Sequence, residues 1–399
     1  MSDTMPSPSP VDQSPAAAAG ASVPPPAPSD PSEGPTPGLG ERRKKNRIDK
    51  FFKSVVTNDG SDLHLKSEVV PRIRIHGDLQ YMKTDPIDPA DMDSMIEEML
   101  NPEQLHHFRE HGTVDLAYAI NKVDRFRVNI FRQRGTTSLV ARRINPKIPN
   151  YKDLGIPAIF SKVAEVEQGL VILAGITGSG KSTTIAAMLG QINDSKAVHI
   201  VTLEDPIEYS YTDNKSIINQ REIGLDVDSW EAGIRAMMRE DPDVILIGEM
   251  RDRATFSAAI TAAETGHLVF STIHASSAPG CITRILELFP QELHDNIRQA
   301  LAANIVCVAF QKLVPGLKRK RVPVVEVMLN SPSVRKYILE EREAELGAII
   351  RKEKGTGSID FNEMLAEYVM SETITSKEAL LASPNPDELR MRLKGISAH

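Results

Sequence analysis

The most specific chemistry in this sequence lies in the loop from Gly175 to Ser182. Its residues, Gly-Ile-Thr-Gly-Ser-Gly-Lys-Ser, match the phosphate-binding loop pattern at every fixed position. Glycines let the backbone curl so that successive N–H groups point at phosphate oxygens. Lys181 would neutralise the β- and γ-phosphates, and the Ser182 hydroxyl would ligate Mg²⁺. We predict a nucleoside triphosphate site made by Gly175, Ile176, Thr177, Gly178, Ser179, Gly180, Lys181, Ser182 and Thr183.

Two groups of carboxylates follow apolar segments farther along the chain. Glu249 comes two residues after the apolar run 244–247, and an acid at such a strand end lies close to a phosphate loop, where it can reach the metal or its waters. Glu204, Asp205 and Glu208 follow the apolar run 197–203. Three carboxylates in five positions repel one another unless a cation or water network holds them. We expect one to orient the attacking water and another to support the Mg²⁺ shell.

Histidines and arginines supply further candidates. His267 and His274 flank a predicted strand, so they lie at its opposite ends and do not form a metal pair. A structural role and a phosphate-sensing role both remain open for them. Triphosphate hydrolysis also gains from an arginine that stabilises developing charge at a domain or subunit boundary. The candidates in the N-terminal half are Arg125, Arg127, Arg132, Arg142 and Arg143.

The segments around these residues indicate how they are positioned. A buried strand over 170–174 precedes the loop and a helix over 182–189 follows it. Near-continuous apolar runs at 197–203 and 244–247, flanked by helical segments, are typical of a largely parallel sheet buried on both faces. We therefore predict an α/β ATPase domain over 153–399, with a helical C-terminal region past Ser331.

The N-terminal half has a different pattern. Alternating strands at 71–76, 125–131 and 137–144, with a helix over 91–100, predict a smaller α+β domain over residues 47–152. Residues 1–46 are rich in Pro, Ala and Ser, and a basic run from Arg42 to Arg47 lies at their junction with the next segment. Such a segment has too little apolar surface to offset its ordering entropy, so we predict a disordered tail there.

Composition narrows the class of protein. The net charge of −7 weighs against a nucleic-acid-binding surface, which is normally basic. Cys281 and Cys307 have no metal-ligand spacing, so reduced cytoplasmic thiols are expected. No apolar stretch approaches the ~20 residues that span a bilayer, and no secretory signal is visible. We expect any membrane association to go through a partner or a peripheral surface.

Taken together, the boxes at 175–182, 204–208, 243–252 and 265–274 resemble those of the secretion ATPases, and within them the PilT/PilU group of type IV pilus retraction motors. Segments 60–65, 125–129 and 219–224 match as well, and the resemblance covers residues 48–393. It implies a homohexameric ring of chains with an N-terminal PAS-like domain and a C-terminal RecA-like P-loop core. ATP, bound with Mg²⁺ between the two domains, would drive domain rotation that acts on an inner-membrane pilus platform protein.

The resemblance also implies roles for single residues. Glu208 matches the general base and Glu249 the Mg²⁺-linked acid, so that Ser182, Glu204 and Glu249 are the predicted Mg²⁺ residues. The other predicted catalytic residues are Lys181, Arg127, Arg142, His267 and His274.

The cysteine content bears on whether the motor drives pilus retraction or assembly. Assembly and type II secretion ATPases usually carry a larger N-terminal region and a four-cysteine zinc site, which Cys281 and Cys307 cannot form. This favours retraction, in the cytoplasm and peripheral to the inner membrane through partners. Segments 333–338 and 357–360 depart from the retraction group, so the PilT and PilU branches stay open, as does a paralogous retraction ATPase as partner. The alternatives are an assembly, secretion or DNA-uptake motor and a weakly hydrolysing accessory subunit, whereas a direct nucleic-acid function is disfavoured.

Overall fold

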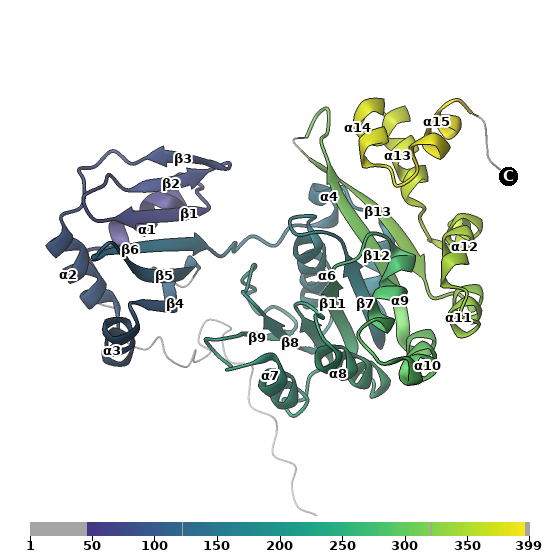
Figure 1. The fold of residues 1–399 in the computed structure, drawn as a ribbon, viewed down its shortest axis with the longest axis horizontal. Coiled ribbons are helices and arrows are strands. Elements are labelled where there is room, and N and C mark those ends of the chain that lie inside the picture. The colour runs from purple at the N-terminus through teal and green to yellow at the C-terminus, as the bar shows by residue number, and fades with distance from the viewer. Residues whose placement is uncertain (1–45, 122, 320, 396–399) are drawn as a thin grey trace, which may run out of the picture. The chain divides into compact units, whose positions relative to one another are not determined.

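A computed structural model of the protein describes residues 46–121, 123–319 and 321–395 (Figure 1). Residues 1–45 of the predicted disordered tail lie outside this range. The domain boundaries expected at residues 46 and 152 stay predictions. Within the described residues, no helix is long and apolar enough to cross a membrane.

An antiparallel sheet organises the N-terminal part, with strands in the order β3-β2-β1-β6-β5-β4. Alternation along β5 buries Phe126, Val128 and Ile130 on one face, where they form a core with side chains from α1 and α2 such as Phe52 and Met92. The opposite face carries polar side chains such as Arg127 and Asn129 together with apolar ones such as Phe131. The elements are α1 (Asp49–Thr57), β1 (Asp62–Lys66), β2 (Arg72–Ile75), β3 (Asp78–Tyr81), α2 (Pro89–Met99), α3 (Pro102–His111), β4 (Thr113–Ala119), β5 (Arg125–Gln133) and β6 (Thr136–Arg143).

The second sheet has seven strands in the order β13-β12-β7-β11-β10-β8-β9. All neighbours are parallel except β13, which runs antiparallel to β12 at the edge. Its strands are β7 (Gly169–Ala174), β8 (His199–Glu204), β9 (Ile217–Glu222), β10 (Val244–Ile247), β11 (Leu268–Ile273), β12 (Ile305–Val314) and β13 (Val322–Leu329). β7, β10 and β11 are buried along their whole length, as the apolar runs predict.

Helices cover both faces of this sheet (Figure 1). One hydrophobic core packs α7 to α12 against it, and the other packs α5, α6 and α13 to α15. The helices of this part are α4 (Tyr151–Leu154), α5 (Ile159–Ala164), α6 (Lys181–Ser195), α7 (Trp230–Met237), α8 (Arg253–Glu264), α9 (Ala278–Leu286), α10 (His294–Asn304), α11 (Pro332–Leu339), α12 (Leu346–Lys352), α13 (Phe361–Met370), α14 (Ser376–Ala382) and α15 (Pro386–Leu393), with short 3-10 turns η1 (Gln291–Leu293), η2 (Glu343–Glu345) and η3 (Lys354–Thr356).

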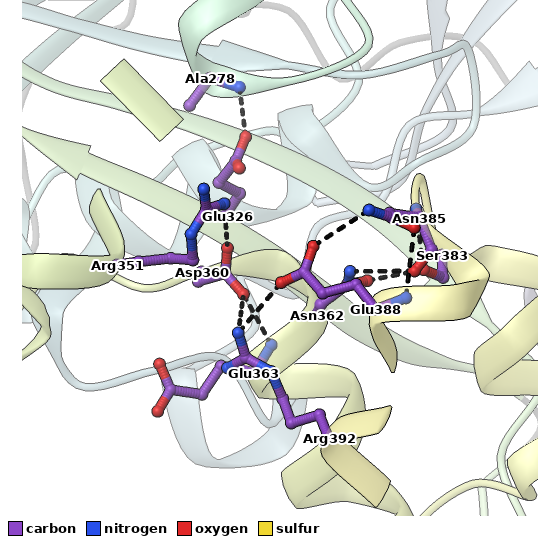
Figure 2. Close-up of polar contacts among 10 residues, drawn as sticks. All are labelled: Ala278, Glu326, Arg351, Asp360, Asn362, Glu363, Ser383, Asn385, Glu388 and Arg392. Atoms are coloured by element: carbon purple, nitrogen blue, oxygen red, sulfur yellow. Dashed lines mark hydrogen bonds and ion pairs between the residues drawn. The ribbon is translucent and has the colours of Figure 1, made fainter. Parts of the chain in front are cut away.

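A polar network lies where the C-terminal helices meet the edge of the sheet, as Figure 2 shows. Glu326 on β13 accepts a hydrogen bond of 2.6 Å from the Ala278 N–H at the start of α9. Asp360 caps α13 by accepting from the Glu363 N–H, and it pairs with the guanidinium groups of Arg351 and Arg392 at 3.7 Å. The two ion pairs thus join α12 and α15 to the N-terminus of α13, and the Glu326 hydrogen bond joins β13 to α9.

Candidate nucleotide site

A cleft of about 490 Å³ opens at the carboxyl ends of β7, β8, β10 and β11. Parallel strands present their carboxyl ends at one edge of a sheet, so the loops that follow them meet there. Residues 177–183 of the predicted phosphate loop line the cleft. The predicted acids and one predicted histidine line it as well: Glu204, Asp205, Glu208, Glu249 and His274.

The loop itself has the backbone that its glycines permit. Gly175, Gly178 and Gly180 all have positive φ, at 145°, 76° and 88°. Close packing adds a second constraint, because a Cβ at Gly175 would lie 2.4 Å from the Gln311 carbonyl oxygen. A side chain at Gly175 would therefore displace the loop. The loop leads directly into α6, whose N-terminus favours negative charge.

Lys181 is the cation of the loop. Its side chain is largely buried, and Nζ donates to the carbonyl oxygens of Gly175 at 2.9 Å and Ile176 at 3.2 Å. Burial lowers the pKa of Lys181, and the negative charges of Glu249 and Glu208 oppose that shift. The ammonium thus spans the mouth of its own loop, where phosphate oxygens would be stronger acceptors than carbonyls.

Glu249 lies between two basic side chains at the same edge. One carboxylate oxygen is 3.0 Å from His274 Nε2, and the other is 2.8 Å from a terminal nitrogen of Arg251. The predicted pair of motifs, the acid after β10 and the histidine after β11, is therefore in direct contact. Because β10 and β11 are neighbouring parallel strands, this contact follows from their register.

The acids at and after the end of β8 differ in environment. Glu204 is buried, accepts from the Thr202 hydroxyl at 2.7 Å, and burial raises its pKa to about 7. Glu208 is exposed and lines the cleft four residues later. These two carboxylates can therefore do different chemistry, since one is held in a fixed position and the other is accessible to water.

Three predicted catalytic residues lie elsewhere. His267 precedes β11, at the opposite edge of the sheet from the phosphate loop, where Nδ1 contacts the Ala262 carbonyl at 2.8 Å. Arg127 on β5 and Arg142 on β6 stand directly opposite each other in the six-stranded sheet. The Arg142 guanidinium pairs with Asp62 at 2.9 Å. The catalytic roles expected of all three stay predictions.

Gln311 on β12 contacts the phosphate loop, and the sequence analysis did not single it out. Its side chain is 2% exposed, donates to the Ser179 carbonyl and accepts from the Thr184 hydroxyl, both at 2.8 Å. It therefore holds the phosphate loop to the sheet from behind. The available signal was a single amide side chain directly after the apolar run 305–310. Tyr209, whose hydroxyl lies 2.9 Å from the Thr183 hydroxyl, was missed as well.

A phosphate loop at the carboxyl edge of a parallel, helix-covered sheet, with acids on adjacent strands, defines a RecA-like P-loop ATPase. The chain belongs to the family described as Type II/IV secretion system protein, whose profile matches residues 40–379.

Similarity to individual proteins supports this family assignment. The chain is 35% identical to the type IV pilus ATPase PilU of Pseudomonas aeruginosa, over 87% of this chain and 91% of that protein. It is 38% identical to the type IV pilus retraction ATPase PilT of the same organism, over 80% and 92%. A crystal structure of the pilus retraction motor PilT with bound ADP matches with a TM-score of 0.80 at 35% identity, covering 87% of this chain and 99% of that one. The predicted fold class, nucleotide binding and ATPase activity are thus confirmed.

Proposed function

We propose that this protein is a motor that hydrolyses ATP to power retraction of type IV pili. One observation carries the proposal: the likeness to the PilT retraction motor extends through both sheets, over 87% of this chain. The motor would act as a homohexamer on an inner-membrane platform protein, so that it is cytoplasmic and peripheral to the membrane. A paralogous retraction ATPase is a further partner under this proposal.

Within the cleft, the phosphate loop and Lys181 would hold the β- and γ-phosphates of ATP. Lys181 would exchange its carbonyl partners at Gly175 and Ile176 for phosphate oxygens, which brings its charge to the group that is transferred. Glu208, exposed at the cleft, would orient the attacking water and accept its proton. Gln311 would keep the loop in the required conformation from behind.

The residues present also fit Mg²⁺. This ion is usually held by one or two protein ligands together with phosphates and waters, and Ser182, Glu204 and Glu249 line one cleft beside the loop. Mg²⁺ bound with ATP would neutralise charge on the β- and γ-phosphates. Glu249, through its contact with His274, would link the phosphates to the loop that follows β11. Arg127, Arg142 and His267 stay candidates for stabilising charge from other positions.

The proposal is tested by deleting the gene in its host and counting surface pili. Loss of a retraction motor leaves assembly unopposed, so the deletion strain should accumulate pili and lose twitching motility. The wild-type gene should restore both, and the Lys181→Ala gene should restore neither. Loss of pili in the deletion strain would instead assign the motor to assembly.

The likeness to PilU over 348 residues supports a second candidate, a weakly hydrolysing accessory subunit. Steady-state phosphate release by the purified chain separates the two. Sustained turnover supports an autonomous motor, and negligible turnover with intact ATP binding supports the accessory role. Light scattering with ATP and Mg²⁺ tests assembly, because a chain that stays monomeric contradicts the ring.

A further inference from the structure

A second cavity, of about 470 Å³, lies in the N-terminal part of the chain, on the six-stranded sheet. It is formed on the face opposite the helices, since Leu63 and Leu65 of β1 point into the core and His64 and Lys66 point away from it. Most of its wall is apolar. This cavity shares no residue with the nucleotide cleft.

Register brings three polar side chains together on this face. Arg72 of β2 stands directly opposite His64 of β1. Ser138 of β6 stands opposite Lys66, two positions along β1 from His64. Residues two apart on a strand share a face, and diagonal neighbours across strands lie within reach of long side chains. The three residues come from strands that are far apart in the sequence.

Each of the three side chains has a buried polar atom with no hydrogen-bond partner among the described residues. These atoms are His64 Nε2, Arg72 Nε and Ser138 Oγ, and all three residues line the cavity. Ser138 is only 4% exposed. Leaving such a group unpaired costs about 1–3 kcal/mol. One unpaired atom is an ordinary imperfection, but three on residues that line a single cavity indicate a site that receives acceptors once small side-chain rotations present these atoms to it.

Charge around the cavity selects the kind of acceptor. Lys66 and Arg72 line it, and none of the described residues lining it is acidic. The terminal nitrogen of Arg72 already donates to the Tyr81 hydroxyl at 3.0 Å, and its guanidinium lies 4.4 Å from that ring. Only part of the guanidinium therefore remains for a ligand. Burial, followed by the charge of Arg74, lowers the pKa of His64, which favours the neutral imidazole.

We propose that this cavity binds a small organic monocarboxylate with an apolar body. The carboxylate accepts from the Ser138 hydroxyl and the Arg72 Nε–H, and neutral His64 completes its hydrogen bonds. Val70, Phe131 and Val140 contact the apolar body. The volume lies within the usual range for small-ligand sites. The inference is independent of the proposed motor function, because every residue that carries it lies on the six-stranded sheet and its loops.

Calorimetric titration of the full-length chain with sodium octanoate tests the site, with 1-octanol as the uncharged probe of the same length. Octanoate should bind one molecule per chain, and octanol should bind at least about tenfold more weakly because it lacks the charged acceptor. Ser138→Val should weaken octanoate about tenfold, since it removes one charge-assisted hydrogen bond. Arg132→Gln, which changes an arginine outside the cavity, is the matched control and should leave octanoate affinity unchanged.

Several outcomes would overturn the proposal. They are the absence of saturable octanoate binding, equal affinity for octanol, and unchanged affinity in Ser138→Val. The titration is repeated on the chain assembled with ATP and Mg²⁺. If assembly abolishes octanoate binding, the cavity is a contact surface for a second copy of this chain, and the proposal of a small-molecule site is wrong. Retained binding in the assembled chain supports the site.

Discussion

The nucleotide cleft and the cavity on the six-stranded sheet both gather polar side chains, but the two sites differ in whether those side chains have partners. In the cleft the charged groups have partners: Lys181 donates to two loop carbonyls, and Glu249 pairs with His274 and Arg251, although the Ser179 hydroxyl of the loop has no partner among the described residues. In the cavity Ser138 Oγ and two nitrogen atoms have no partner among the described residues. The cleft thus exchanges existing contacts when its ligand arrives, whereas the cavity would gain contacts.

This difference determines what a substitution should do. Removing one member of a partnered set leaves the other member buried and unsatisfied, which is costly. Removing a polar group that has no partner takes away a penalty that the folded state already carries. Substitutions in the two regions should therefore differ in sign as well as in size.

Lys181→Ala should have the largest effect. It removes the only cation of the phosphate loop, and loss of one preorganised electrostatic contact to a reacting group typically lowers turnover about 100- to 1,000-fold. Steady-state phosphate release measures it. Lys196→Ala is the matched control, because that ammonium donates to the Glu165 carbonyl and does not line the cleft. Near wild-type turnover in Lys181→Ala would contradict the assignment of the site.

Glu326→Gln extends the comparison to a buried acid that accepts a hydrogen bond from the Ala278 N–H, as Figure 2 shows. Burial raises the pKa of Glu326 from 4.5 to about 7, so the folded state favours the protonated acid. Its contribution is fully present below about pH 4.5 and is lost as the pH rises through about 7, by up to about 3 kcal/mol.

Glu204 also has its pKa raised to about 7, so it contributes to the loss of stability over the same pH range. The useful quantity is therefore the difference in pH dependence between the wild type and Glu326→Gln. Urea unfolding between pH 5 and pH 8 should show a smaller loss of stability for Glu326→Gln than for the wild type. Gln keeps an acceptor for the Ala278 N–H but cannot ionise. Identical pH profiles for the two proteins would show that Glu326 does not titrate in this range.

Gln311→Leu should cost about 2 kcal/mol of folding stability, because it leaves the Thr184 hydroxyl and the Ser179 carbonyl without that partner. The KM for ATP should rise as the phosphate loop loosens. Urea unfolding and ATPase kinetics measure the two effects. Gln80→Leu, at an exposed position on β3, is the control and should change stability by less than about 0.5 kcal/mol. A stable variant with unchanged KM would remove Gln311 from the site.

Local patterns predicted the cleft well, and for a physical reason. A phosphate loop is contiguous, and Glu249, Glu204 and His274 each follow an apolar strand, so a parallel sheet places them at one edge. The catalytic role expected of His267 comes from the resemblance, whereas its position beside the strand leaves a structural role equally open; it lies at the opposite end of β11 from the phosphate loop. His267 lies far from the phosphate loop because residues that precede parallel strands meet at the amino edge of the sheet, whereas the loop lies at the carboxyl edge.

Gln311 and the cavity residues could not be predicted in this way. Gln311 contacts the loop only because β12 lies beside β7, although more than a hundred residues separate Gln311 from Ser179. His64, Arg72 and Ser138 meet through the pairing of β2, β1 and β6, and a shift of one residue would turn a strand's side chains to the opposite face. Register between distant strands is a property of the whole sheet, so no local spacing encodes it.

The smallest expected effect is the most informative about the comparison. Ser138→Val replaces a buried hydroxyl that has no partner with an apolar side chain that suits a strand, so stability should stay unchanged or rise by up to about 1 kcal/mol. Ser67 is a matched control, equally buried at 3% exposed, but its hydroxyl donates to the Thr137 carbonyl at 3.1 Å. Ser67→Val should therefore destabilise the chain by about 1 kcal/mol. Urea unfolding measures both. If the two variants lose the same stability, the Ser138 hydroxyl has a partner in solution, and the contrast between the two regions is wrong.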